Sequence, residues 1–217
     1  MSGVVTVSRA LTPRNWTSTS DPTNGWDAAD GVRVGDHWFN TASGNVFVCV
    51  SNTVGAAVWR HIPRMLGQSG TAIAHTGTTS ETKIASVLVP AGAMGANGHL
   101  QIETAWSNTN NANNKTRVIR FGSGDNVSGT SFHGVVSTTN FMQSSQIMIS
   151  NSTTSVQYGW YSTGLTGGPG NFAAAGVAGA IDTTAASYVV MSGILANSAD
   201  TMTLLAYKVT LTRPDIT

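Results

Sequence analysis

Charged side chains are scarce in this sequence. They make up 10% of its 217 residues, and the net charge at pH 7 is +1, whereas about 25% of a typical soluble domain is charged. The polar surface must therefore consist mainly of hydroxyl and amide groups, since Ser, Thr, Asn and Gly together make 92 of the residues. Because no run of Lys or Arg is present, we expect no electrostatic binding to nucleic acid.

Cysteine and long apolar runs are also nearly absent. The single Cys49 excludes an internal disulfide and a cysteine-based zinc site, and it is typical of a chain made in a reducing cytoplasm. The histidines show no HxH or HExxH spacing, so no metal or other cofactor is expected. No apolar stretch of about 18 residues occurs, and residues 1–10 lack a signal-peptide pattern, so no membrane insertion is expected.

Motifs of common enzyme classes are missing too. Residues 129–133 begin like the nucleophile elbow of hydrolases but lack its closing glycine. The glycine-rich segment 164–170 is not followed by Lys and Ser or Thr, so it is not a phosphate-binding loop. Glycosidases use a pair of carboxylates, and Glu103, beside His99 and Gln101, has no evident partner. We expect a non-enzymatic protein, with a glycan hydrolase or esterase as the less favoured alternative.

The recurrent pattern is an alternation of apolar and polar residues between clusters of Gly, Asn, Asp and Ser, which predicts an all-β protein. Leu100, Ile102 and Trp106 share one face of a strand and are expected to face a core. In residues 155–161 we expect the face with Val156, Tyr158 and Trp160 to be inside and Tyr161 to be exposed.

Three regions are expected along the chain. Residues 1–30 are rich in Ser, Thr, Pro and Asp and are expected to be an extended segment that orders on a partner surface. Residues 31–66 form a small β module with three strands around 34–39, 45–50 and 58–62. Residues 63–71 are expected to be a hinge, and residues 67–217 a jelly-roll β-sandwich. Its expected strands centre on residues 71–75, 84–89, 99–106, 115–121, 131–136, 146–150, 155–161, 187–195 and 202–212.

The small module resembles a known pattern. Residues 34–41 (VGDHWFNT), 44–50 (GNVFVCV) and 55–59 (GAAVW), preceded by Asp21-Pro22-Thr23, resemble a short module common in bacteriophage tail fibres, spikes and other virion appendages. Its layout of two strands, a turn and a terminal Trp is also similar to small chitin-binding modules. The resemblance implies that residues 1–30 anchor the chain to other virion proteins of a capsid or tail.

The second half carries a further resemblance. Residues 89–98 (VPAGAMGANG), 106–115 (WSNTNNANNK) and 120–122 (RFG) resemble C-terminal domains of phage structural proteins, which are similar to the trimeric jelly rolls of tumour necrosis factor and complement. The resemblance implies a homotrimeric virion appendage that touches a host surface. A head spike of a gene transfer agent fits as well as a phage tail fibre.

Candidate ligand residues are aromatic rings and amides, since sugars stack on rings and pair their hydroxyls with amides. Core or interface packing is the competing explanation for each ring, and a plain loop for the amides. A long irregular loop, residues 164–179, is expected to be functional or to be ordered by another subunit. The candidate carbohydrate-binding residues are Trp26, Trp38, Trp59, Trp106, Asn108, Asn110, Asn111 and Tyr161.

The leading hypothesis is a non-enzymatic virion appendage, made in a host cytoplasm, that binds host-surface polysaccharide extracellularly and promotes adsorption. Low charge and apolar β faces favour a homotrimer, which would cover those faces by cyclic symmetry. A purely structural capsid or tail decoration protein without glycan binding is the alternative.

Overall fold

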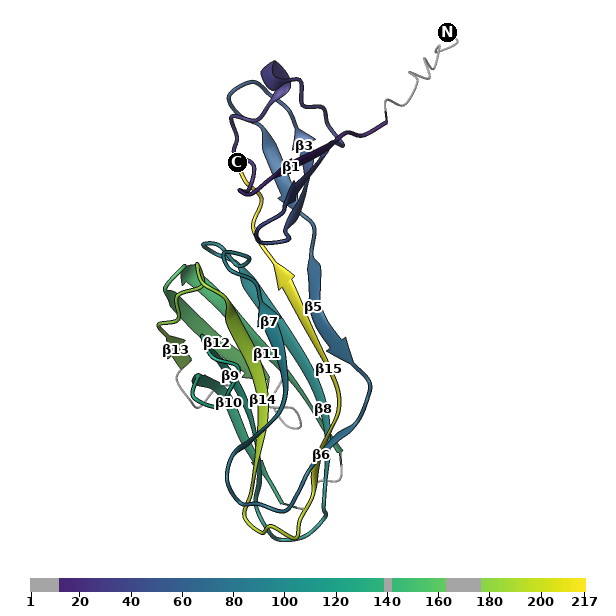
Figure 1. The fold of residues 1–217 in the computed structure, drawn as a ribbon, viewed down its shortest axis with the longest axis vertical. Coiled ribbons are helices and arrows are strands. Elements are labelled where there is room, and N and C mark those ends of the chain that lie inside the picture. Colours follow the sequence, from purple (N-terminus) through teal and green to yellow (C-terminus); the bar gives the residue numbers. More distant parts are fainter. Residues whose placement is uncertain (1–11, 139–141, 163–176) are drawn as a thin grey trace. The chain divides into compact units, whose positions relative to one another are not determined.

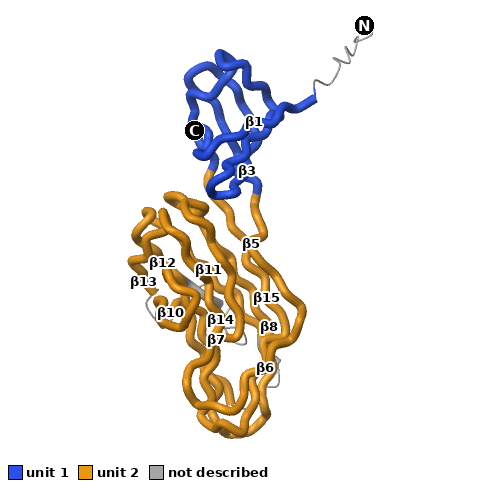
Figure 2. The backbone as a smooth tube through the Cα atoms, viewed as in Figure 1, with its two compact units in different colours: residues 1–62, 215–217 blue, residues 63–214 orange. Residues whose placement is uncertain are grey.

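The computed structural model describes residues 12–138, 142–162 and 177–217, and side chains in these ranges except those of residues 142–143 and 160–162. The chain divides into two compact units, which Figure 2 shows in two colours. Unit 1 comprises residues 1–62 and 215–217, and unit 2 comprises residues 63–214. Residues 1–11 of the expected anchoring segment 1–30, and most of the loop 164–179, lie outside the described residues.

Unit 1 is built on one four-stranded sheet in the order β1-β2-β3-β4. Its elements are β1 (Asn15–Ser18), the 3-10 helix η1 (Ala28–Asp30), β2 (His37–Asn40), β3 (Val46–Ser51) and β4 (Val58–His61). Strand β1 pairs with β2 in parallel, whereas the other pairs are antiparallel. The turn between β2 and β3 places Gly44 at a φ of 75°, a left-handed conformation that glycine adopts without strain.

Unit 2 is a β-sandwich of two antiparallel sheets (Figure 1). The smaller sheet has the order β10-β9-β14-β7, and the larger has the order β13-β12-β11-β8-β15-β5, with β6 also paired to β15. The strands are β5 (Arg64–Ser69), β6 (Ile73–His75), β7 (Thr82–Val89), β8 (His99–Asn108), β9 (Lys115–Gly122), β10 (Thr130–Ser137), β11 (Met142–Thr153), β12 (Val156–Ser162), β13 (Val177–Gly179), β14 (Ser187–Leu195) and β15 (Met202–Thr212).

The core of unit 2 lies between these sheets and confirms the predicted all-β sandwich. Leu100, Ile102 and Trp106 of β8 are buried in it, as their alternation predicts, together with Ile119 and Phe121 of β9. Side chains on the opposite face of β8 remain partly exposed. Burying one face of each sheet against the other is therefore what holds unit 2 together.

The predicted boundaries of the small module are wrong in two respects. The module has four strands rather than three, because β1 comes from residues 1–30, which were expected to lie outside the module. The C-terminal residues also belong to it, since Trp59 and Ile216 exchange two backbone hydrogen bonds of 3.0 and 2.9 Å. Both additions pair residues that are far apart in the sequence, so local composition carries no sign of them.

The expected hinge at residues 63–71 is a strand. Residues 64–69 form β5, which pairs antiparallel with β15. Gly67, one of the residues that suggested flexibility, lies so close to Val87 that an added Cβ would come within 2.9 Å of a Val87 methyl. Here glycine serves close packing rather than bending.

The expected faces of β12 are also reversed where they are described. Tyr158 is exposed, whereas the neighbouring Gln157 is fully buried. The buried amide is satisfied because Gln157 Nε2 donates to Asn151 Oδ1 and to the Ile181 carbonyl, and its Oε1 accepts from the Ile181 N–H. A buried polar side chain with all its partners present is tolerated in a core, and hydrophobicity alone does not predict it.

Candidate functional site

Four indole rings form one continuous cluster in unit 1. The ring centroids of Trp16 and Trp26 are 6.0 Å apart, those of Trp26 and Trp38 are 5.0 Å apart, and those of Trp38 and Trp59 are 5.8 Å apart. The parallel pairing of β1 with β2 places Trp16 directly opposite Trp38. Each ring is therefore fixed by its neighbours, and the cluster runs from the core to the surface.

Exposure and hydrogen bonding distinguish Trp26 from the other three rings. The indole N–H groups of Trp16, Trp38 and Trp59 donate to Asp36 Oδ2, the Ser20 carbonyl and the Trp26 carbonyl, respectively. Trp26 is 38% exposed, and its indole N–H has no hydrogen-bond partner in the described part of the chain. This side chain thus offers both a ring face and a donor to solvent.

Three of the predicted ring platforms are core residues instead. Trp38 and Trp59 are buried in the core of unit 1, and Trp106 in the core of unit 2. The prediction that these rings present a face to sugar is therefore wrong for the chain as it folds. The physical reason is the large apolar area of an indole, which is buried wherever a second layer can cover it.

Asp36 is the buried group that holds the β1 segment against the sheet. Its carboxylate accepts from the backbone N–H groups of Arg14 and Arg33 and from the Trp16 indole. Burial by itself would raise the pKa of Asp36, but these hydrogen bonds and the Arg14 charge lower the pKa below its ordinary value. An ionised Asp36 thus orients Trp16 beside Trp26.

The Asn-rich loop between β8 and β9 is mostly structural. Asn111 and Asn113 donate to the two carboxylate oxygens of Asp200, and the fully buried Lys115 donates to Asn111 Oδ1. Lys115 Nζ also lies 3.7 Å from Asp200 Oδ2. The prediction that the Asn111 amide is available to a ligand is therefore wrong, because this amide hydrogen-bonds to both members of a buried ion pair.

Of the other candidate ligand residues in unit 2, one is buried, one is exposed and one has a side chain outside the described residues. Asn108 is buried and donates to Ser137 Oγ, so it is not free to meet a sugar. Asn110 is exposed at the loop tip and stays a candidate. The side chain of Tyr161 lies outside the described residues.

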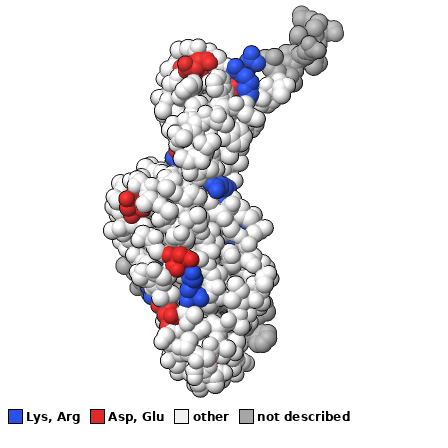
Figure 3. Space-filling model, in the orientation of Figure 1, with Lys and Arg blue, Asp and Glu red and all other residues white. Residues whose placement is uncertain are grey.

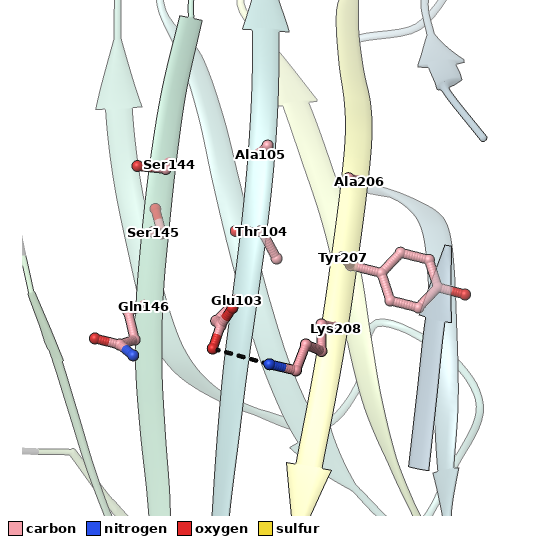
Figure 4. A pocket seen from close by; sticks show the side chains of 9 residues that line it. All are labelled: Glu103, Thr104, Ala105, Ser144, Ser145, Gln146, Ala206, Tyr207 and Lys208. Carbon is pink, nitrogen blue, oxygen red and sulfur yellow. Dashed lines mark ion pairs between the residues drawn. The ribbon is translucent and has the colours of Figure 1, made fainter. Parts of the chain in front are cut away.

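A pocket on the outer face of the larger sheet was not expected from the sequence. It has a volume of about 460 Å³ and lies across β11, β8 and β15 (Figure 4). Glu103 Oε1 lies 3.6 Å from Lys208 Nζ, and Gln146 stands opposite Glu103 on the next strand. We call this feature the sheet pocket. Its lining comprises Glu103, Thr104, Ala105, Ser144, Ser145, Gln146, Ala206, Tyr207 and Lys208.

The sequence alone indicates only one of the two strands whose side chains form the ion pair of this pocket. The outward polar residues of β8 are visible in the alternation, and Glu103 is among them. Its partner Lys208 is on β15, which becomes a neighbour of β8 only through the sheet order. Strand order is set by long-range pairing, so the ion pair was not predictable.

The described residues offer neither a metal-ion site nor a membrane-spanning helix. No group of three or more His, Cys, Asp or Glu side chains in them is arranged to hold a metal ion. No helix among them is long and apolar enough to cross a membrane.

Comparison with known proteins identifies no family. No family model and no curated protein matches the chain. Among solved structures, it is similar to alginate lyase AlgAT5 from polysaccharide lyase family 7, with 9% identity and a TM-score of 0.33, over 80% of this chain and 81% of the lyase. It is also similar to a structure of infectious bursal disease virus strain Gx, with 9% identity and a TM-score of 0.25, over 72% of this chain and 42% of that chain.

Proposed function

We propose that this protein is a non-enzymatic, homotrimeric virion appendage, either a head spike or a tail fibre, that binds host-surface polysaccharide and promotes adsorption. In this proposal the N-terminal part of residues 1–30 docks to other virion proteins. The rings and amides that remain at the surface then contact sugar. The motifs at residues 34–59 and 89–122, which resemble phage structural modules, support the virion part of the proposal.

The observation that carries the sugar-binding part is the exposed Trp26. A sugar ring binds an indole through its C–H groups, and a hydroxyl can accept the free indole N–H. Because Trp16 and Trp38 hold the Trp26 ring on either side, little side-chain entropy is lost on binding. An indole held in place at the surface, with one ring face and its N–H open to solvent, is therefore suited to a sugar ligand.

The low surface charge fits a neutral ligand. Figure 3 shows few charged side chains on the face it displays, and the whole chain carries a net charge of +1. Such a surface does not concentrate polyanions by long-range attraction. Each contact would be weak, and three linked sites per trimer would raise avidity by about 10²–10⁴-fold.

Replacement of Trp26 by alanine tests this site. We expect the Trp26→Ala chain to lose at least about tenfold in affinity for a host polysaccharide, about 1.4 kcal/mol, because the stacking face and donor disappear. Trp26→Phe should retain part of the affinity, since the ring face remains but the N–H is lost. Binding is measured on purified host-envelope polysaccharide by calorimetry, and adsorption by cell-binding counts.

The matched control is Val34→Ala, because Val34 is an exposed apolar residue of the same unit, at 63% exposure, that lies outside the indole cluster. This variant should bind as the unchanged chain does. Equal affinity of the Trp26→Ala and unchanged chains, or no binding of either to any host polysaccharide, would contradict the proposal.

The trimer has its own test. Light scattering after size-exclusion chromatography should give three times the 22.5 kDa chain mass at micromolar concentration. A stable monomer would remove the avidity argument while leaving the Trp26 site intact.

One observation favours the purely structural alternative. Leu88 on β7 and Val136 on β10 are about half exposed, at 48% and 54%, on the outer face of the smaller sheet. Exposed apolar side chains often mark protein contacts. If protein contacts of this kind are the only role of this chain, particles that lack the chain should be less stable, and the purified chain should bind no glycan.

The enzymatic alternative gains no support from the sheet pocket. Glu103 is the one carboxylate among the residues that line it, whereas typical glycoside hydrolysis uses two carboxyl groups on either side of the scissile bond. Release of reducing ends from host polysaccharide would revive this alternative.

A further inference from the structure

We propose that the sheet pocket is a second carbohydrate site, which takes a neutral polysaccharide lying across the strands of the larger sheet. The proposal takes its ligand class from the proposed function, but it concerns different residues in a different unit. It goes beyond the Trp26 site because it assigns a role to Glu103, Lys208 and Gln146.

The first support is a polar row that runs across four strands. Gln146 of β11 is in register with Glu103 of β8, Glu103 with Lys208 of β15, and Lys208 with Gln68 of β5. Neighbouring strands are about 4.8 Å apart, which is close to the length of one hexose unit in an extended chain. A polysaccharide crossing the sheet would therefore meet one polar side chain at each strand.

The second support is a trough beside that row. One position further along β8 on the same face, Ala105 is in register with Ser144 of β11 and Ala206 of β15. These three side chains are small, whereas the residues of the polar row are long, and the difference in height creates the pocket seen in Figure 4. The C–H face of a sugar ring can lie on the alanine methyl groups while its hydroxyls reach the polar row.

The third support is the character of the ion pair. Glu103 and Lys208 are 42% and 45% exposed, and exposed pairs of this kind contribute little to stability. Gln101 Nε2 donates to Glu103 Oε1 at 2.9 Å, which fixes the carboxylate. The pair thus offers a positioned acceptor and a positioned donor for adjacent hydroxyls, at little cost to the fold if either is changed.

The same pair selects the charge of the ligand. With both partners present the polar row carries no net charge, so a polyuronate gains nothing from Lys208 that it does not lose to Glu103. Two amides flank the pair on β11 and β5, and they bind hydroxyls without a charge preference. We therefore infer a neutral rather than an acidic polysaccharide.

The test is a titration of the full-length chain followed by TROSY NMR. The probes are neutral hexasaccharides of glucose, mannose and galactose, with a galacturonic acid hexamer as the acidic probe. We expect at least one neutral probe to shift the amide signals of β8, β11 and β15 around residues 103, 146 and 208, and the side-chain amide signals of Gln146 and Gln68. The acidic probe should bind more weakly.

Two variants sharpen the test. Glu103→Ala should lower the affinity for the neutral probe about tenfold, because a hydrogen bond to a charged group is lost. Glu103→Gln leaves Lys208 unpaired and should improve binding of the acidic hexamer about threefold to fivefold. The control is Asp125→Asn, which breaks the similarly exposed Lys83–Asp125 pair elsewhere in unit 2 and should change neither affinity.

The outcomes separate this site from Trp26. Shifts around Glu103 that persist in the Trp26→Ala chain support the sheet pocket even if the Trp26 site fails. Shifts confined to unit 1, a preference of the unchanged chain for the acidic hexamer, or equal effects of Glu103→Gln and Asp125→Asn would overturn the proposal.

Discussion

Between pH 7.5 and pH 4.5, unit 2 is expected to lose about 2–3 kcal/mol of stability through His133 alone. This side chain is 2% exposed on β10. Burial and the charge of Arg117 on the neighbouring strand lower the pKa of His133 from 6.5 to about 4. The unfolded chain therefore takes up a proton below pH 6.5 that the folded chain refuses until about pH 4, so stability falls through that window as pH falls.

Arg117 stays charged throughout this range. Burial lowers its pKa from 12.5 to about 10, which is still well above the pH of the experiment. Burial also lowers the pKa values of His75 and His99, and these groups add to the effect with the same sign. The contribution of His133 must therefore be isolated by a variant.

The measurement is urea unfolding of the unchanged chain and of His133→Gln at pH 7.5 and 4.5, followed by amide exchange in β9 and β10. Between the two pH values, the loss of stability should be smaller in the variant than in the unchanged chain by about 2–3 kcal/mol. Arg117→Met should raise the pKa of His133 toward 6.5, as read from its ring signals in NMR. Parallel pH profiles of the unchanged chain and His133→Gln would show that His133 titrates normally.

Trp59→Ala is expected to destabilise unit 1 by about 3–5 kcal/mol, the usual cost of removing a buried large aromatic side chain. Trp59 is fully buried, contacts Trp38 edge-on and donates from its indole to the Trp26 carbonyl. Its backbone also binds Ile216. The substitution removes the ring contact with Trp38 and the indole hydrogen bond, and it weakens the packing of Ile216 against the unit 1 core.

Urea unfolding monitored by tryptophan fluorescence reports this change, because four of the six tryptophans are in unit 1. Trp26→Ala is the matched control, since it removes an exposed ring of the same cluster. It should cost less than about 1.5 kcal/mol in stability while it weakens binding to the host polysaccharide by at least about tenfold. If the two variants lost equal stability, the distinction between a core ring and a ligand ring would be wrong.

The contrast between Trp26 and Trp59 also marks what could be predicted of the candidate site. Both were candidates because an indole suits either a core or a sugar, and residue type cannot separate the two. The decision came from β1, which pairs with β2 and so covers part of the indole cluster. That pairing joins residues about twenty positions apart, and no local pattern encodes it.

The Asn-rich loop between β8 and β9 also shows that residue type alone does not identify a ligand site. Its composition indicates an amide-rich surface, and only the approach of Asp200 to Lys115 turns Asn111 and Asn113 into structural ligands of an ion pair. The sheet pocket was missed for a related reason. Glu103 is on the face of β8 opposite the predicted core face, but its partners in the polar row are on three other strands.

The sequence by itself determined the features that depend on residues close together in the chain. The alternation of apolar and polar side chains predicted an all-β chain, the bounds of β14 and β15 and the buried face of β8, because the pleat of a strand has a period of two residues. The tertiary structure decided the strand order, the inclusion of the C-terminal residues 215–217 in unit 1 and the exposure of each described tryptophan side chain. These features depend on which strands pair across long separations in the sequence. Such pairs cost chain entropy to form, and they become stable only when both sheets of the sandwich are packed together.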